Sequence, residues 1–271
     1  MPTSSPITLT TDFGLEDTYV GQLKGAILAI DPEATIVDLC HHVAPFDIQG
    51  GSYALEVGCF AFPAGSIHVA VVDPGVGTDR RLLAVQAGGH RFLAPDNGLL
   101  GRVLERATPW VAHAIQNRSY FGPRTSRTFA ARDVLGPVAA WIGRGVELER
   151  LGPAVTDLVG LTIERPRLEL GHAVRVPVLA VDRFGNVVLD VTAEALGALL
   201  GHAPDESTEL QLAAEGGSVE RFARTYGETA GREPFFLVNS AGYLEVAVAA
   251  GRADETLGLR IGMHPALRVD R

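Results

Sequence analysis

The sequence IHVAVVDPGVGT, residues 67–78, decides the class of fold. Its first seven residues form a β-rich apolar run, which predicts a strand over Ile67–Asp73. The glycines that follow, Gly75 and Gly77, allow the backbone to approach a ligand closely. A strand that ends in such a loop is typical of an open α/β sheet, in which ligands bind beyond the carboxyl ends of the strands.

Further strand and helix signals alternate on both sides of this stretch. Strands are predicted at Ile7–Thr11, Thr35–Cys40, Leu82–Gln86, Arg91–Ala94 and Trp110–Ile115, and helices at Tyr19–Ile30, Ile48–Cys59, Gly98–Arg106 and Arg132–Gly143. This alternation predicts βαβ units. We therefore expect an α/β domain over residues 1–160, with a mostly parallel sheet and helices outside it.

The pattern changes after Leu158. A linker is expected over residues 161–171, where Pro166 and alternating charges interrupt the pattern. Beyond it, short strands are predicted at Val174–Asp182, Val187–Val191, Glu209–Leu212, Phe235–Val238 and Tyr243–Val248, with one helix at Ala193–Leu200 capped by Thr192. We expect residues 172–271 to form a smaller all-β domain, an antiparallel sandwich or barrel.

The composition excludes several classes of protein. The 23 basic and 32 acidic residues give a net charge of −9, whereas a nucleic-acid binder needs a surplus of Lys and Arg. Two cysteines are too few for a secreted disulfide framework. No apolar run approaches the ~20 residues of a membrane span, and residues 1–6 carry no signal-peptide pattern. A cytoplasmic protein is expected, with neither nucleic acid nor a membrane as its partner.

Three of the predicted strands lead into segments that contain carboxylates: Asp12 with Asp17 close behind it, Asp38, and Asp73. A carboxylate at a strand end suits a ribose, because it accepts hydrogen bonds from both vicinal hydroxyls. A single strand-end Asp is also typical of a helix N-cap or an Asx turn. Three such segments in succession favour a binding site.

Asp73 and Arg80 lie on either side of a glycine-containing turn, at a spacing that lets them face each other over a small site. The alternative is a tight turn with a surface ion pair. The stretch lacks the third glycine of a dinucleotide fingerprint and the Gly-Lys-Ser/Thr of a P-loop. In the second domain Phe184 can stack on a heterocycle and Asn186 can bind both a donor and an acceptor, as adenine presents. Each of these segments also suits a hairpin turn.

Taken together, these segments resemble the S-adenosylmethionine (SAM) hydroxide adenosyltransferase family, whose relatives include fluorinases and chlorinases. The resemblance runs almost end to end. It is carried by residues 10–14 (TTDFG), 19–25 (YVGQLKG), 45–48 (PFDI), 72–78 (VDPGVGT), 94–100 (APDNGLL), 182–186 (DRFGN) and 239–244 (NSAGYL), and by Thr128-Phe129 with Arg132-Asp133. Each segment is weak alone, whereas the ordered set is highly specific.

The resemblance implies a hydrolase. Water or hydroxide would attack C5′ of the ribose of SAM, and methionine would depart as a neutral thioether, leaving adenosine. Asp73 would orient or partly deprotonate the water, and Arg80 would stabilise its hydroxide character. The His that completes this set in the family is replaced here by Ala130. By this resemblance SAM would be the substrate, and neither a cofactor nor a metal is expected.

The resemblance also implies which residues bind the substrate. They are, with the group each would contact, Asp12 (ribose hydroxyls), Asp17 and Asp182 (methionine ammonium), Phe46 (against the substrate), Phe184 and Tyr226 (the two faces of adenine), Asn186 (adenine edge) and Ser240 (methionine carboxylate). Ala241 stands where fluorinase has an Arg. Because the family assembles as trimers, a homotrimer with its sites at the subunit interfaces is expected.

Two other functions stay open from the sequence. Ala130 neither donates nor accepts a proton, and loss of an acid–base partner often lowers a rate by about 10²–10⁴. A SAM- or adenosine-binding protein without turnover is therefore the main alternative. A SAM-dependent halogenase is disfavoured, because Asp73 stands where halogenases carry a Tyr and would repel a halide. Ala131 also lacks the hydroxyl of the halide-contacting Ser.

Overall fold

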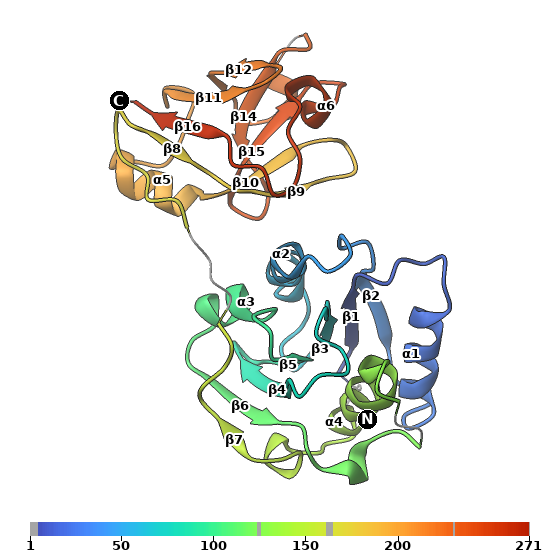
Figure 1. Ribbon diagram of the computed structural model, residues 1–271. Coiled ribbons are helices and arrows are strands. Elements are labelled where there is room, and N and C mark those ends of the chain that lie inside the picture. Colours follow the sequence, from blue (N-terminus) through green and yellow to red (C-terminus); the bar gives the residue numbers. More distant parts are fainter. Residues whose placement is uncertain (1–4, 124–125, 161–164, 230, 271) are drawn as a thin grey trace. The chain divides into compact units, whose positions relative to one another are not determined.

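A computed structural model describes residues 5–123, 126–160, 165–229 and 231–270 of this chain. The chain divides into two compact units, residues 1–163 and residues 164–271 (Figure 1). Each unit has its own hydrophobic core, so each is described by itself.

The described part of the first unit contains a seven-stranded sheet in the order β2-β1-β3-β5-β4-β6-β7 (Figure 1). Strands β2, β1, β3 and β5 are parallel neighbours, and β4, β6 and β7 extend the sheet in antiparallel fashion. The strand bounds are β1 Ile7–Thr11, β2 Ile36–Cys40, β3 Ile67–Val71, β4 Leu82–Ala87, β5 His90–Pro95, β6 Trp110–Ala114 and β7 Ala154–Val155. The expected α/β class is confirmed.

Helices cover both faces of this sheet (Figure 1). They are α1 (Tyr19–Leu28), α2 (Ile48–Cys59), α3 (Gly101–Arg106) and α4 (Gly136–Gly143), with 3-10 turns at Arg118–Tyr120 and Leu148–Arg150. Successive residues of a strand point to opposite faces. Accordingly Val69 of β3 packs in the core that α1 and α4 cover, and Ala70 packs in the core that α2 and α3 cover.

Two predicted helices differ from the structure. The helix expected over Gly98–Arg106 begins only at Gly101, because Gly98 has a φ of +94°, which a right-handed helix does not accommodate. The helix expected over Arg132–Gly143 consists of a π-helical turn, Ala131–Leu135, followed by α4. Gly136 lies at their junction and faces α1, where an added Cβ would come 2.7 Å from Leu23 Cδ1.

The described part of the second unit contains two sheets, β13-β14-β15-β10-β9 and β12-β11-β16-β8. Apart from the parallel pair β13 and β14, neighbouring strands are antiparallel. The bounds are β8 Ala173–Arg175, β9 Val178–Val181, β10 Val187–Thr192, β11 Leu210–Ala214, β12 Gly217–Val219, β13 Arg221–Phe222, β14 Pro234–Val238, β15 Tyr243–Val248 and β16 Ala266–Val269. One core joins residues of both sheets, so the expected β-rich domain is confirmed.

Helix α5 (Ala193–Leu200) begins where the sequence predicts, because the Thr192 hydroxyl accepts a hydrogen bond from the Ala195 N–H at 3.1 Å. The expected strand Val174–Asp182 is wrong as a single element. It is divided between β8 and β9, which belong to different sheets. Pro177 lies at the break and cannot donate a ladder hydrogen bond.

Four short strands (β7, β12, β13 and β16), helix α6 (Ala253–Leu257) and the 3-10 turns, including Tyr226–Glu228, were not predicted. Of the expected linker, residues 161–164 lie outside the described residues. Leu168 and Leu170, farther along that linker, pack against the core of the second unit. Among the residues described, no helix has the length and apolar character needed to cross a membrane.

Candidate functional site

Asp73 and Arg80 form a direct ion pair at the end of β3. Nε of Arg80 lies 2.7 Å from both carboxylate oxygens of Asp73, and the Arg80 NH2 group also donates to Asp73 Oδ2. Only 7% of the Asp73 side chain and 13% of the Arg80 side chain are exposed. The charges are therefore held in one geometry and shielded from solvent, as a preorganised catalytic pair requires.

The turn between these residues explains the glycines. The Thr78 hydroxyl donates to the Gly75 carbonyl at 2.7 Å, which closes the turn. Gly77 has a φ of +87°, and a Cβ there would come 3.0 Å from the Arg127 carbonyl oxygen. A Cβ on Gly75 would come 3.2 Å from Arg80 Cδ. The glycines therefore let the turn bring Arg80 back onto Asp73.

Asp12 emerges at the same edge of the sheet. β1 and β3 are parallel neighbours with Thr11 opposite Val71, so the residues that follow both strands lie close together. Asp12 Oδ2 accepts a hydrogen bond from the Phe46 N–H at 2.9 Å. Phe46 has a φ of +67° and is 70% exposed, so this bond holds a bulky aromatic residue in a strained conformation beside the carboxylate.

A cavity of about 380 Å³ lies over Asp12 and Asp73, within the range typical of small-molecule sites. Its lining is mostly apolar and includes three aromatic rings that pack together. The rings of Tyr19 and Phe129 stand nearly perpendicular with their centroids 5.2 Å apart, and the Phe13 ring lies 5.8 Å from each of them. An acidic floor under an aromatic wall suits a cationic ligand with an apolar part.

Ala130 and Ala131 also line this cavity. They follow a loop that Asp133 holds, because Asp133 Oδ2 accepts from the Ser126 N–H at 2.6 Å. Arg132 Nε donates to Asp133 Oδ1 at 2.6 Å, and its guanidinium lies 5.0 Å from the centre of the Phe129 ring. Burial alone would raise the pKa of Asp133, but the bonds from Arg132 and Ser126 outweigh it and lower that pKa. Arg132 and Asp133 thus shape the cavity wall.

Asp38, the third carboxylate of the sequence argument, lies inside β2 and does not line the cavity. Its Oδ1 is 3.0 Å from His41 Nε2, and its Oδ2 accepts from Lys24 Nζ at 2.7 Å. The other nitrogen of the His41 ring lies 2.8 Å from the Thr11 hydroxyl oxygen. Through His41, Asp38 therefore stabilises Thr11 at the end of β1, the residue before Asp12. Asp17 is exposed and does not line the cavity.

In the second unit Asp182 closes a turn after β9. Its Oδ1 accepts from the Phe184 and Asn186 N–H groups, both at 2.8 Å, and its Oδ2 accepts from the Asn186 side-chain amide at 3.0 Å. The turn leaves Phe184 74% exposed while Asn186 is buried. The hairpin-turn role is therefore present, and the turn also presents an aromatic ring and orients an amide.

Tyr226 and the turn that contains Ser240 lie around another carboxylate, Glu245 of β15. The Tyr226 hydroxyl donates to Glu245 Oε1 at 2.7 Å, and the Asn239 side-chain amide donates to Oε2 at 3.2 Å. Burial is the main reason that the pKa of Glu245 is raised. Burial and the bond to Glu245 raise the pKa of Tyr226 as well. Ser240 is exposed beside this network.

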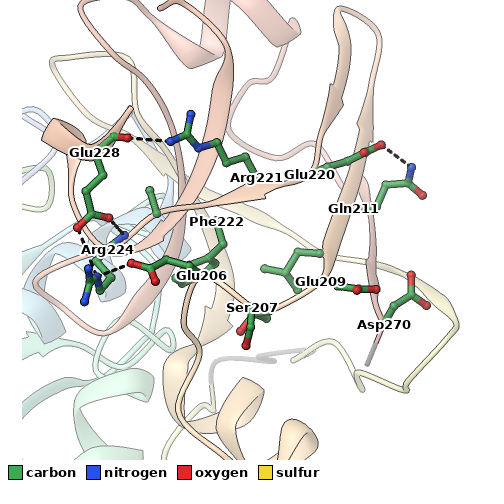
Figure 2. Close-up of a pocket in the computed structure, with 13 residues that line it drawn as sticks. Glu206, Ser207, Glu209, Gln211, Glu220, Arg221, Phe222, Arg224, Glu228 and Asp270 are labelled. Atoms are coloured by element: carbon green, nitrogen blue, oxygen red, sulfur yellow. Dashed lines mark hydrogen bonds and ion pairs between the residues drawn. The ribbon is translucent and has the colours of Figure 1, made fainter. Parts of the chain in front are cut away.

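A larger hollow, about 1000 Å³, lies on the second unit among charged residues (Figure 2). Its arginines are paired within the chain: Arg224 Nε lies 2.5 Å from Glu206 Oε1 and 3.3 Å from Glu228 Oε1, and Arg221 donates to the Glu228 carbonyl at 2.7 Å. None of the predicted site residues lines it. The cavity over Asp12 and Asp73 is therefore the better candidate site.

The residues of these sites that were not singled out from the sequence include Tyr19, Val76, Phe129 and Glu245. The first three line the cavity and belong to, or adjoin, the segments that carry the family resemblance. The signal for Glu245 was its position as the one charged residue of the strand YLEVAV.

Two models of one protein family match this chain. The model of the SAM hydroxide adenosyltransferase N-terminal domain matches residues 7–152. The model of the C-terminal domain of the same family matches residues 176–265.

Individual relatives match along nearly the whole chain. An (R)-S-adenosyl-L-methionine hydrolase from Salinispora tropica is 38% identical over 263 residues, covering 94% of this chain and 95% of the relative. One from Thermus thermophilus is 34% identical over 95% of this chain and 97% of its own length. A fluorinase from Actinopolyspora mzabensis is 27% identical over 98% of this chain and 97% of its own. The crystal structure of an uncharacterized conserved protein from Thermotoga maritima superposes with a TM-score of 0.89 at 31% identity, over 97% of this chain and 99% of that one.

Proposed function

The chain belongs to the SAM hydroxide adenosyltransferase family, and we propose that it hydrolyses SAM to adenosine and L-methionine. The observation that carries this proposal is the shielded Asp73–Arg80 pair beside a cavity with an acidic floor and an aromatic wall. The relatives named as SAM hydrolases support it.

The proposed reaction does not need an acid to protonate the leaving group. An oxygen lone pair of water forms a bond to C5′ of the ribose, and the C5′–S bond breaks with its electron pair passing to sulfur. The sulfonium becomes a neutral thioether, so the leaving group requires no proton. The water must lose one, and the main task of the protein is to aim and activate that water.

Asp73 and Arg80 suit that task. Asp73 borders the cavity and Arg80 lies behind it, bonded to both carboxylate oxygens. Each carboxylate oxygen has a further lone pair that accepts from water. Asp73 thus accepts the proton of the attacking water, and Arg80 stabilises the negative charge that develops. Ala130 and Ala131 add no donor beside Asp73, which disfavours a halide as nucleophile.

The remaining contacts are proposed by residue. Asp12 accepts from the ribose hydroxyls, Phe46 lies against the substrate, and Asp17 and Asp182 hold the methionine ammonium. Phe184 and Tyr226 lie on the two faces of adenine, Asn186 binds its edge, and Ser240 binds the methionine carboxylate. Asp182 already accepts three bonds from its own turn, so its role combines positioning of Asn186 with attraction of the ammonium.

These residues come from both units, and we propose a homotrimer in which neighbouring subunits complete each site. Large apolar side chains that line the cavity of the first unit are exposed in the single chain, among them Tyr19, Phe46 and Val76. So are Phe184 and Tyr226 of the second unit. Exposed apolar groups of this kind favour association.

A second candidate, binding of SAM without turnover, is favoured by one observation: Ala130 lines the cavity with only a methyl group. Chromatography of SAM incubated with the purified protein, in ¹⁸O-labelled water and with or without halide, separates the candidates. Hydrolysis gives adenosine that grows with time, is independent of halide and carries ¹⁸O at its 5′ hydroxyl. Intact SAM together with calorimetric binding would establish the binding protein, and a requirement for halide would establish a halogenase.

A further inference from the structure

We propose that Glu245 is a positioning residue that fixes Tyr226 and Asn239 as the surface on which the second unit receives the adenosine part of the ligand. The inference rests on the proposed function, in which Tyr226 contacts adenine. It adds to that function a buried carboxylate that contacts no substrate and acts through its two neighbours.

Glu245 lies where a strand does not ordinarily place a charge. It is in β15, the middle strand of a five-stranded sheet, opposite Leu237 of β14 and Val188 of β10. The strand is buried throughout, and Glu245 itself is only 4% exposed. Burial of a carboxylate opposes folding unless its charge is compensated. Leu244 and Val246 on either side of it pack in the main core, whereas Glu245 lies on the opposite face of the strand, which it shares with the apolar Ala247. The carboxylate therefore calls for another explanation.

The partners of Glu245 supply that explanation. Both of its oxygens accept hydrogen bonds, from the Tyr226 hydroxyl at 2.7 Å and from the Asn239 amide at 3.2 Å. Within the described residues, its hydrogen-bond and ion-pair partners include no arginine or lysine. Burial raises the pKa of Glu245, and the neighbouring charge of Asp182 raises it a little further. The carboxylate thus directs two polar side chains without the stabilisation that a cation would give.

Tyr226 is the first of these side chains. Its hydroxyl is bound to Glu245 and its ring edge meets Phe235 at a centroid distance of 6.4 Å, yet 49% of the residue is exposed. A ring held at one end, with much of its surface open, is a ready stacking surface for a flat heterocycle.

The turn that carries Tyr226 is also held by two arginines that line the charged hollow of Figure 2. Arg221 donates to the Glu228 carbonyl at 2.7 Å, and the Arg224 N–H donates to Glu228 Oε2 at 2.9 Å. Glu228 ends the 3-10 turn that Tyr226 begins. The backbone of the turn is therefore set independently of Glu245, and Glu245 sets the direction of the ring.

Asn239 is the second side chain. Its amide nitrogen donates to Glu245, while its Oδ1 accepts from the Ala241 and Tyr243 N–H groups at 3.0 and 3.1 Å. The amide is therefore bound at both ends, and it fixes the turn in which Ser240 is exposed. A carboxylate only accepts hydrogen bonds, so it receives both donors; a glutamine would turn an NH₂ group toward one of them.

The test is calorimetric titration of the intact protein with adenosine, together with steady-state hydrolysis of SAM. We compare wild type, Glu245→Gln, Tyr226→Phe and the double variant. Glu209→Gln is the control, because Glu209 is an exposed carboxylate of the same unit. Glu245→Gln should weaken adenosine binding about tenfold, the scale of a lost hydrogen bond to a charged group, and raise KM for SAM more than it lowers kcat. The control should bind like wild type.

The double variant separates a positioning role of Glu245 from a merely structural one. If Glu245 acts through the Tyr226 hydroxyl, the double variant should bind adenosine no more weakly than Glu245→Gln alone, because the two effects then do not add. Additive effects, or wild-type affinity in Glu245→Gln with only a changed melting temperature, would overturn the inference while leaving SAM hydrolysis by the wild type intact. If Glu245→Gln does not fold, wild-type affinity in Tyr226→Phe overturns it. Absence of both adenosine binding and hydrolysis in the wild type would overturn the proposed function, and the inference with it.

Discussion

Nε of Arg80 is equidistant, at 2.7 Å, from the two carboxylate oxygens of Asp73. The arginine therefore stabilises the whole carboxylate, and Asp73, but not Arg80, lines the cavity. In the proposed mechanism this relationship suits Asp73 as an acceptor for water, with Arg80 as its electrostatic partner.

Asp73→Asn should lower the rate of adenosine formation by about 10²–10⁴, the usual effect of losing a proton acceptor. It should change SAM affinity far less, because the amide keeps the shape of the carboxylate. Rates from chromatography and affinities from calorimetry test this. Asp79→Asn, an exposed carboxylate close by in the same turn, should retain the wild-type rate. Equal losses of rate and affinity in Asp73→Asn would make Asp73 a binding residue.

Ala130→His should raise kcat. The new imidazole would point into the cavity beside Asp73 and provide an acid–base partner, worth about 10²–10⁴ in rate when well placed. The pH profile of kcat should then gain a limb near 6.5, the ordinary pKa of histidine. Ala130→Leu, which fills the same space without a titrating group, should gain neither. A histidine variant with an unchanged rate and profile would show that the chain does not use an acid–base partner at this position.

Gly77→Ala should destabilise the first unit by about 1–3 kcal/mol, because an L-residue is strained at a positive φ and its Cβ would press on the Arg127 carbonyl. The turn that brings Arg80 onto Asp73 would distort, so hydrolysis should fall as well. Gly21→Ala is the contrast: an added Cβ meets no atom within 4 Å, and alanine favours the exposed helix by about 0.5–1 kcal/mol. Urea unfolding gives the free energy of unfolding of both variants. Equal values for Gly77→Ala and Gly21→Ala would contradict the strain argument.

The stability of the first unit should fall as the pH decreases below about 6.5. Burial, with the neighbouring His90 ring, lowers the pKa of His68 from 6.5 to about 3. The unfolded chain therefore takes up a proton below 6.5 that the folded chain refuses until about 3, and the free energy of unfolding decreases across this interval. The His68 ring also bonds to Thr8 and His90 at 2.7 and 3.1 Å, so it is held in place while uncharged.

Urea unfolding of wild type and His68→Gln at several pH values between 7 and 4 tests this linkage. The variant should be less stable at pH 7 but lose less stability on acidification. His42→Gln, an exposed histidine of the same unit, should follow the wild-type curve. Parallel curves for wild type and His68→Gln would show that another group causes the acid sensitivity.

The local signals in this chain were sufficient for most elements and failed at particular residues. The cap of α5 was visible because Thr192 acts within its own turn. The break at Pro177 was missed because an apolar run on both sides conceals a change of sheet. Helix α3 was started too early because the positive φ of Gly98 is a property of the folded turn. Strands as short as β13 carry too little pattern to be detected.

The sequence by itself determined the order of an α/β unit and a β-rich unit, and the family, because periodicity and ordered motifs are properties of the linear chain. Only the tertiary structure decided which of the candidate residues lie together. It joined Phe46 to Asp12 across 34 positions and Tyr226 to Glu245 across 19, and it directed Asp38 away from the cavity. The physical reason is that hydrogen bonding and desolvation act between atoms brought together in space, and the chain brings these atoms together only when its strands pair and its turns close.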